Sequence, residues 1–441
     1  MKMQQFRTLV LTVVILFSYE LHSKTKTDGD QTITKTAELV FPVKAGHALV
    51  FDGSSIELQI ETWERDEVQL TATAVYKGKE SKKMTEFLDA FQQQVASQSF
   101  QSGDRIDISA DLEVPNKVQV GSRFIGVQIS YGDDELDIYY ALKVPSYLDM
   151  DLKDSYKDVS ILGDYQGNIS LEHYSGDVRA GNFEALKLEL KYGEAKLQSV
   201  NNGQFVLYEQ ELEVEQVSNL RLDMKYSQIT SQELNTVQLE AYESELTVGR
   251  MADVTGEIKY TKINSDIGIQ TLTLTASYES QIKAKSIGRL QNRDSKYCQY
   301  EAVSVDHLEM RNSYEDKYTF GYAGEVLLSG KYLELTIMEL GQSLALDGYE
   351  AKVSIDGLSD KTELIQIDGK YNVLELETGT SAVKLDIDVE YGEIDFDKSQ
   401  YTRKVYIKDD SDLIIEAESK NFTGPSMTLM LRGYEFNATI N

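Results

Sequence analysis

The sequence predicts an all-β protein: a parallel β-helix, or β-solenoid, with units of about 18 residues, preceded by a strand-rich region with one helix. Three observations predict it. A tyrosine recurs at nearly constant spacing over more than half of the 441 residues, alternating apolar and polar residues fill the intervals, and no proline occurs between residues 146 and 424. A fixed period is typical of stacked repeats, and period-two alternation indicates strands. The lack of proline suits ladders that use every backbone N–H.

The N-terminus predicts export. Lys2 and Arg7 precede the apolar run Leu9–Phe17, and polar residues follow up to Ser23. This is the layout of a secretory signal peptide, and the run is shorter than the roughly 20 residues that span a bilayer. We therefore expect residues 1–23 to be removed and no transmembrane segment to remain. The alternative is an uncleaved membrane anchor. The expected location is the cell surface, the outer envelope or the periplasm.

Composition excludes several classes of function. The chain has 44 Lys+Arg against 73 Asp+Glu, for a formal charge of -29. Such a chain repels phosphate backbones, so we expect no nucleic-acid partner. One cysteine excludes disulfide scaffolds, iron–sulfur clusters and cysteine-based zinc sites. A hydrophobic content of 41% is enough for a sizeable core.

Residues 24–145 predict an N-terminal β-rich region. Ser55–Thr62 and Glu67–Val75 alternate apolar and polar residues with period two, as strands do. Ser81–Ser97 has its apolar residues on one face at helical spacing, which predicts the single helix. Pro145 ends the region. Further strands are expected at Arg105–Leu112, Val118–Ser130 and Leu136–Val144.

Residues 146–400 predict the solenoid. Between Tyr156 and Tyr391 the tyrosine recurs in 13 steps of about 18 residues, which predicts fourteen units. Most units have an alternating strand that leads into the tyrosine, then two or three small or polar residues, then another short strand. A unit this small cannot bury its own apolar face, so stacking is expected. The recurring tyrosines are Tyr156, Tyr174, Tyr192, Tyr208, Tyr226, Tyr242, Tyr260, Tyr278, Tyr297, Tyr314, Tyr332, Tyr349, Tyr371 and Tyr391.

An antiparallel meander with hairpin turns at the tyrosines is the alternative fold. It is disfavoured because no Asn-Gly or Asp-Gly pair recurs at the turn position. Residues 401–441 are expected to close the array as a C-terminal capping segment.

The tyrosines predict a stacked ladder at a corner of the coil. Most share the parity of the apolar residues before them, as Tyr192 does with Leu188 and Leu190, so we expect the rings to point inward with the hydroxyls at the edge. The alternative is an exposed aromatic row that stacks on sugar rings. The next apolar residue comes three positions after Tyr226 but four after Tyr242, and this alternates along the chain. Either successive coils differ, or the true coil is a pair of units.

The order of features resembles the bacterial putative-adhesin family over most of the mature chain. The resemblance lies in the opening Phe41-Pro42-Val43, a second strand that ends in Trp63 before Glu67-Val68, the Val144-Pro145 pair, and repeated turns such as Tyr174-Ser175-Gly176-Asp177-Val178. The Tyr-rich turns depart from the Gly-Ser-Gly-Asp turns more typical of that family. The resemblance implies a β-solenoid exported to the cell envelope or surface, and it brings no catalytic residues.

No catalytic, cofactor-binding or metal-binding residue is predicted. His22, His47, His173 and His307 are isolated, and Gly324–Lys331 lacks the spacing of a phosphate loop. Cys298 is expected to be a packing residue. Two acidic clusters are expected to be solvated loops, with Ca²⁺ binding as the alternative. They are Asp133-Asp134-Glu135 with Asp137, and Asp409-Asp410 with Asp412.

The predicted function is non-catalytic: an exported envelope or cell-surface scaffold that presents a long, acidic, repetitive face to a glycan or protein partner. The first alternative is a carbohydrate-active enzyme, a polysaccharide lyase or hydrolase, because acids on neighbouring coils about 4.8 Å apart approach the spacing of catalytic carboxylate pairs. The second alternative is a periplasmic structural or signalling component.

Overall fold

A computed structural model of the chain describes residues 31–79, 81–115, 119–120, 135–409, 411–420 and 426–441. The predicted signal peptide lies outside these residues, as do Asp133, Asp134 and Asp410. The chain is mostly strand with one helix, and it forms a parallel β-solenoid of about 13 turns of about 18 residues, which confirms the predicted fold class. It divides into two compact units, Met1–Val214 and Glu215–Asn441.

The first unit holds the helix and the earlier strands, and its last strand, β11, runs across the division into the second unit. The elements are β1 (Gln31–Pro42), β2 (Ala48–Asp52), β3 (Glu57–Trp63), β4 (Glu67–Gly78), α1 (Lys82–Ser97), β5 (Ser99–Ser102), β6 (Arg105–Ser109), β7 (Gln119–Val120), β8 (Glu135–Pro145), β9 (Asp149–Ser155), β10 (Val159–Tyr174) and β11 (Val178–Lys225).

An antiparallel sheet and the helix form the N-terminal part of the first unit. Strand β4 pairs antiparallel with β1 on one side and with β8 on the other. The helix α1 begins where the Ser81 side chain accepts a hydrogen bond from the backbone of Met84, which satisfies one free N–H of its first turn. Its apolar face, which includes Phe87 and Phe91, is buried, as the spacing in the sequence predicted.

Parallel stacking begins earlier in the chain than the sequence predicted. Strand β2 pairs parallel with β9, and β3 pairs parallel with β10, although some hundred residues separate the partners. Strands β9, β10 and β11 continue the parallel stack. The alternating residues of β2 and β3 therefore serve as arms of early coils, and the expected start of the solenoid at residue 146 comes after them.

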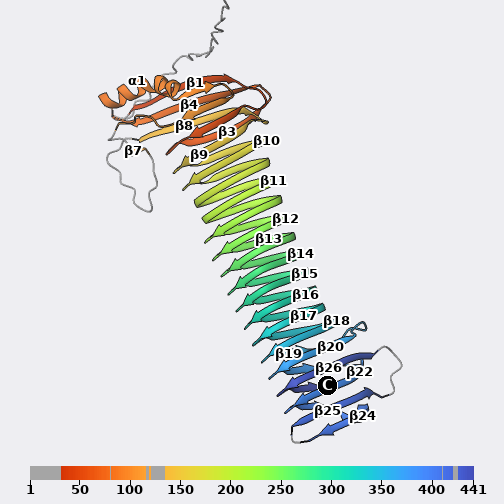
Figure 1. The fold of residues 1–441 in the computed structure, drawn as a ribbon. Helices are drawn as coiled ribbons and strands as arrows, with labels where there is room; N and C mark the ends of the chain where they lie inside the picture. Colours follow the sequence, from red (N-terminus) through yellow and green to blue (C-terminus); the bar gives the residue numbers. More distant parts are fainter. Residues whose placement is uncertain (1–30, 80, 116–118, 121–134, 410, 421–425) are drawn as a thin grey trace, which may run out of the picture. The chain divides into compact units, whose positions relative to one another are not determined.

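The second unit is built from the remaining strands, and Figure 1 shows β12 to β18 stacked side by side. The elements are β12 (Gln228–Tyr242), β13 (Glu245–Lys259), β14 (Lys262–Tyr278), β15 (Gln281–Lys296), β16 (Gln299–Tyr314), β17 (Lys317–Lys331), β18 (Glu334–Tyr349), β19 (Lys352–Ile355), β20 (Leu364–Lys370), β21 (Val373–Leu376), β22 (Ala382–Glu390), β23 (Glu393–Phe396), the 3-10 helix η1 (Lys398–Gln400), β24 (Tyr401–Lys408), β25 (Asp412–Ser419), β26 (Ser426–Tyr434) and β27 (Asn437–Ile440).

The core of the second unit is a set of aligned apolar rows. Each strand from β12 to β18 pairs parallel with the next, and one of the recurring tyrosines stands at the end of each strand or directly after it. One such row runs Val237, Val254, Leu272, Leu290, Leu308, and all five side chains are buried. The coil is therefore a single unit of about 18 residues, and the pairing of units seen in the sequence reflects a difference between successive coils.

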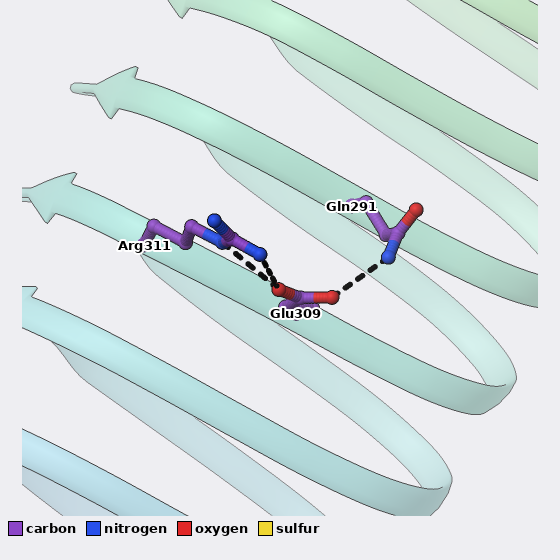
Figure 2. A network of polar contacts seen from close by, with 3 residues as sticks. All are labelled: Gln291, Glu309 and Arg311. Atoms are coloured by element: carbon purple, nitrogen blue, oxygen red, sulfur yellow. Dashed lines mark hydrogen bonds and ion pairs between the residues drawn. The ribbon is translucent and has the colours of Figure 1, made fainter.

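Polar side chains on the outer face of the coils bond to the next coil. Figure 2 shows Glu309 of β16 between Arg311 of the same strand and Gln291 of β15. The carboxylate of Glu309 accepts from Arg311 Nε and Nη2 at 2.9 and 2.8 Å and from Gln291 Nε2 at 2.7 Å. The hydrogen bonds from Arg311 and Gln291 lower the pKa of Glu309. Such contacts join coils at the surface, as the apolar rows join them inside.

The C-terminal strands do not follow chain order. Strand β26 pairs parallel with both β20 and β22, and β27 pairs with both β21 and β23, so the last coil lies between two coils that precede it. Strands β25 and β24 add antiparallel beyond β22. The capping segment expected at residues 401–441 therefore supplies an internal coil as well as the outer edge.

Glycine permits this insertion. Gly433 has φ +146° and lies so close to β20 that a Cβ atom would stand 1.8 Å from the carbonyl oxygen of Gly369. Any larger residue would push the two strands apart.

A polar cluster interrupts the apolar core of the second unit. Tyr300 and Tyr318 stack on each other with ring centroids 5.1 Å apart, and both are fully buried. The Tyr300 hydroxyl lies 2.9 Å from Ser277 Oγ and 2.8 Å from Ser295 Oγ, and it accepts from Asn292 Nδ2 at 3.0 Å. Small serines in the facing row leave room for the rings and supply the partners that the buried hydroxyls need.

The first unit contains a buried polar pair. Asp154 of β9 and His173 of β10 occupy paired positions in neighbouring coils, and their side chains are 4% and 3% exposed. None of their four polar side-chain atoms has a hydrogen-bond partner within the described part of the chain. Burial raises the pKa of Asp154 to about 8 and lowers the pKa of His173 to about 4, so both groups are held neutral near pH 7.

Candidate functional site

The corner of each coil that carries the tyrosine is built in two alternating ways. In one type a tyrosine itself has a left-handed backbone, usually after a lysine, as in Lys259-Tyr260. In the other a tyrosine ends the strand and the next residue is left-handed, usually a glutamate, as in Tyr278-Glu279. We call these the Lys-Tyr corner and the Tyr-Glu corner. The one-residue offset explains why the next apolar residue follows the tyrosine after three positions in one type and four in the other.

The left-handed residues have φ between 43° and 69°, where side chains other than glycine are strained by about 1–2 kcal/mol each. In the Lys-Tyr type they are Tyr156, Tyr192, Tyr226, Tyr260, Tyr297, Tyr332, Tyr371 and Tyr391. In the Tyr-Glu type they are Ser175, Glu209, Glu243, Glu279, Glu315, Glu350 and Glu435.

The residue after the left-handed position stabilises the corner. Ser244 and Ser280 donate their hydroxyls to the carbonyl two residues back, at 2.8 and 2.9 Å. They also accept from the backbone N–H of the preceding coil, that of Ser227 and Thr261 respectively. Asp316 accepts in the same way from the N–H of Cys298 at 2.8 Å. Backbone groups exposed by the turn are thus satisfied between coils.

The strain at these corners is testable at Glu279. We expect Glu279→Gly to be more stable than Glu279→Ala by about 1 kcal/mol, because glycine adopts a left-handed backbone without steric cost while alanine does not. Urea unfolding of the two variants, followed by far-UV circular dichroism, measures the difference. Equal stability would show that the corner is not strained.

The corner tyrosines form what we call the tyrosine ladder. In the first unit its rings are Tyr156, Tyr174, Tyr192 and Tyr208, with neighbouring centroids 5.1–5.6 Å apart. In the second unit neighbouring rings are 5.4–5.9 Å apart, and these contacts are edge-to-face at 66–86°. Its order there is Tyr226, Tyr242, Tyr260, Tyr278, Tyr297, Tyr314, Tyr332, Tyr349, Tyr371, Tyr434, Tyr391.

The predicted stacking is confirmed, but the prediction that the rings point inward is wrong. Tyr226, Tyr260 and Tyr297 are 42–45% exposed. They follow the preceding apolar residues at even spacing, which would place their rings inside only if the extended backbone of the strand continued through the tyrosine. The left-handed backbone at the tyrosine breaks the alternation and turns the ring to the outside.

Exposure alternates along the ladder of the second unit. Every tyrosine of a Lys-Tyr corner is exposed, including Tyr332, Tyr371 and Tyr391, whereas every tyrosine of a Tyr-Glu corner is half-buried. In several Tyr-Glu corners the phenol also bonds to the next glutamate. The hydrogen bond to Glu279 is the main cause that raises the pKa of Tyr278 to about 12, and equivalent bonds raise the pKa of Tyr242 and of Tyr314.

Two charged rows complete the ladder surface of the second unit. Lysines alternate with the half-buried tyrosines at the strand ends, and glutamates alternate with the exposed tyrosines at the turns. Before Tyr391 the lysine position is taken by Glu390, so five lysines stand against six glutamates and this face is close to neutral on a chain of charge -29. They are Lys225, Lys259, Lys296, Lys331 and Lys370, with Glu243, Glu279, Glu315, Glu350, Glu390 and Glu435.

Two open pockets flank the ladder, with volumes of about 560 and 580 Å³. Tyr297 lines both. Tyrosine rings line each pocket together with polar and charged side chains, and Cys298 and Leu333 also line the second. The first is lined by Tyr260, Thr261, Lys262, Tyr278, Glu279, Ser280, Gln281, Tyr297 and Gln299, and the second by Tyr297, Cys298, Gln299, Glu315, Asp316, Lys317, Tyr332, Leu333, Glu334, Glu350 and Lys352.

Two other residues singled out in the sequence, Cys298 and Asp409, make structural contacts in the described part of the chain. Cys298 is buried and donates to Ser277 Oγ and to the Lys296 carbonyl, and burial raises the pKa of its thiol. Asp409 accepts backbone hydrogen bonds from Ser411 and Asp412 in a local turn. In the described residues no three His, Cys, Asp or Glu side chains gather as metal ligands would.

The strand pairing places the protein in the class of parallel β-solenoids. No family model matches the chain, and no curated protein matches it. Among solved structures it is similar to a putative cell adhesion protein from Clostridium sporogenes ATCC 15579, at 9% sequence identity and a TM-score of 0.13, over 92% of this chain and 99% of that chain. Within the described residues, no helix has both the length and the apolar character needed to cross a membrane.

Tyr434 is the ladder residue that the sequence analysis missed, because it falls outside the run of constant spacing. A signal for it exists: Gly433-Tyr434-Glu435 repeats Gly348-Tyr349-Glu350. The alternation of Lys-Tyr and Tyr-Glu pairs is also visible in the sequence, and it marks which tyrosines are exposed.

Proposed function

We propose that the protein is an exported, non-catalytic binding scaffold of the cell surface, and that the ladder of the second unit binds an extended, neutral glycan. The observation that carries the proposal is the row of exposed tyrosines on a nearly neutral corner of the coils that is flanked by two open pockets. The signal-peptide layout of residues 1–23 supports export.

The chemistry of the ladder suits sugars. A pyranose ring has C–H groups on its faces and hydroxyls around its rim. A tyrosine ring offers apolar surface to the C–H faces of the sugar, and its hydroxyl can bond to the hydroxyls at the rim. The flanking amides of Gln281 and Gln299 and the carboxylate of Glu279 can bond several hydroxyls at once. An apolar peptide bound over the ladder would cover these groups without giving them hydrogen-bond partners.

The charge distribution favours a neutral ligand. A net charge of -29 repels anionic polymers such as polyuronates or teichoic acids over distances near a Debye length. The five lysines and six glutamates nearly cancel, so the ladder itself has little excess charge to attract cations. A neutral polysaccharide avoids both effects.

A non-catalytic role is supported by the uniformity of the ladder. Each of its glutamates follows a ladder tyrosine and has a left-handed backbone, so the same Tyr-Glu pair recurs in alternate coils of the second unit. An enzyme concentrates its perturbed acids in one place.

Isothermal titration of the purified mature chain against neutral oligosaccharides tests the proposal. We expect the variant Tyr260→Ala/Tyr297→Ala/Tyr332→Ala to bind at least tenfold more weakly than the wild type. Alanine keeps the Cβ atom, so it removes the ring without relaxing the left-handed backbone.

The matched control is Tyr322→Ala, an exposed tyrosine outside the ladder, which should bind like the wild type. Equal binding by the ladder variant and the wild type would overturn the proposal, as would the absence of binding to any neutral glycan. Release of reducing ends during the titration would favour the carbohydrate-active enzyme instead.

A further inference from the structure

We infer that the glycan is an extended chain of β-1,4-linked neutral pyranoses, in which successive sugars are turned over so that the repeat is two sugars. The inference rests on the proposed function and specifies the ligand for the same surface.

The chemical period of the ladder is two coils. The exposed rings of Tyr260, Tyr297 and Tyr332 belong to alternate coils, and Glu279 and Glu315 stand at the same corner position in the coils between. Neighbouring parallel strands are about 4.8 Å apart, so equivalent exposed rings recur at about 9.6 Å. A ligand bound in register must repeat over the same length.

The intervening rings are not equivalent platforms. Tyr278 and Tyr314 are half-buried, and edge-to-face contacts tie each to the exposed rings on both sides. Their phenols bond to Glu279 and Glu315. The surface therefore offers an apolar platform at one coil and a carboxylate at the next.

A β-1,4-linked chain matches this alternation. It is nearly straight and advances by close to one coil spacing per sugar, and its successive rings are rotated by half a turn. Every second sugar can then present the same face to an exposed tyrosine, while the sugar between turns its hydroxyls to a glutamate. Chains with α-1,4 or β-1,3 links curve, so their sugars fall out of register with the rings after a few coils.

Titration of the full mature chain with neutral hexasaccharides tests the inference. The probes are β-1,4-linked hexamers of glucose, mannose and N-acetylglucosamine, an α-1,4-linked glucose hexamer and a β-1,3-linked glucose hexamer. We expect at least one β-1,4-linked hexamer to bind tenfold or more tightly than either curved chain. Equal binding of straight and curved chains would overturn this inference and leave the proposed function standing. No binding by any of them would overturn both.

A second measurement tests the two-coil period. Glu315→Gln keeps the size and the strained backbone of the residue and removes the carboxylate charge. We expect it to weaken the best β-1,4-linked hexamer about threefold, because a charge-assisted hydrogen bond becomes a neutral one. The control is Glu339→Gln, an exposed glutamate away from the ladder, which should leave the affinity unchanged. Wild-type affinity in Glu315→Gln would contradict a contact at alternate sugars.

Discussion

Replacing Tyr300 by alanine is expected to lower the free energy of unfolding of the second unit by about 3–5 kcal/mol, the usual cost of deleting a large ring from a packed core. The ring is fully buried and stacks on Tyr318 at 5.1 Å. Its loss opens a cavity between strands β15 and β17. It also removes the shared hydrogen-bond partner of Ser277, Ser295 and Asn292.

The variant Tyr300→Phe separates the two effects. It keeps the stacked ring and removes only the hydroxyl, so we expect a loss of about 1–3 kcal/mol from the polar groups left unsatisfied. Urea unfolding followed by far-UV circular dichroism measures both variants, and hydrogen exchange of the β15 and β16 amides locates the loss. Tyr322→Ala, exposed on β17, is the control and should change the stability little. A Tyr300→Ala protein as stable as this control would show that the cluster is not part of the packed core.

Replacing Asp154 and His173 together by leucine is expected to stabilise the first unit by about 1–4 kcal/mol, as when a buried ionisable pair gives way to apolar residues. Four buried polar atoms lack partners at this place among the described residues. The next residue in the same row is the buried Leu190, so leucine suits the row. Fluorescence of Trp63, which lies in the first unit, follows the unfolding of this part of the chain.

The same pair predicts a dependence of stability on pH. Asp154 binds its proton up to about pH 8 when folded but releases it near pH 4 when unfolded, so its contribution to stability falls as the pH rises between these values. His173 behaves oppositely: unfolding allows it to bind a proton below about pH 6.5, so its contribution grows from about pH 4 to 6.5. The two offset each other below pH 6.5. Between pH 6.5 and 8 only the loss from Asp154 remains, about 2 kcal/mol at 1.36 kcal/mol per pKa unit.

Single variants distinguish the two groups. Relative to the double variant, His173→Leu should lose stability steadily from pH 4 to 8, and Asp154→Leu should gain stability from pH 4 to 6.5. Parallel pH profiles for the wild type and the double variant would show that neither group has a shifted pKa.

The sequence predicted the coil and its period because both depend on local patterns. Alternation of apolar and polar residues fixes which side chains of a strand such as β13 face the core, and the tyrosine marks one corner of each coil. The direction of the tyrosine rings could not be read in the same way. A left-handed backbone at a residue such as Tyr226 or Tyr260 is not signalled by glycine or asparagine, the residues that usually mark it, so parity gave the wrong side.

The position of the last coil follows from the alternation of the two corner types along the ladder. Tyr371 and Tyr391 are both left-handed, so they belong to the same corner type and cannot be neighbours in an alternating ladder. Tyr434-Glu435 supplies the missing type, and the structure places Tyr434 between them at 5.9 and 5.4 Å. The alternation was visible in the sequence, but its consequence for strand order requires the packing of the rings.

The inserted coil has a consequence for how the chain assembles. Strands β12 to β18 can each add to a neighbour that has already been synthesised, so this part can grow in the direction of translation. The coil of β22 and β23 cannot dock until residues 426–440 have emerged, since its neighbour on one side is made of them. Until then β20 and β22 each expose a strand edge, and in the finished fold both of these edges pair with β26. Two nascent chains held close together can then exchange residues 426–440, so we expect strand-swapped dimers where this protein misassembles.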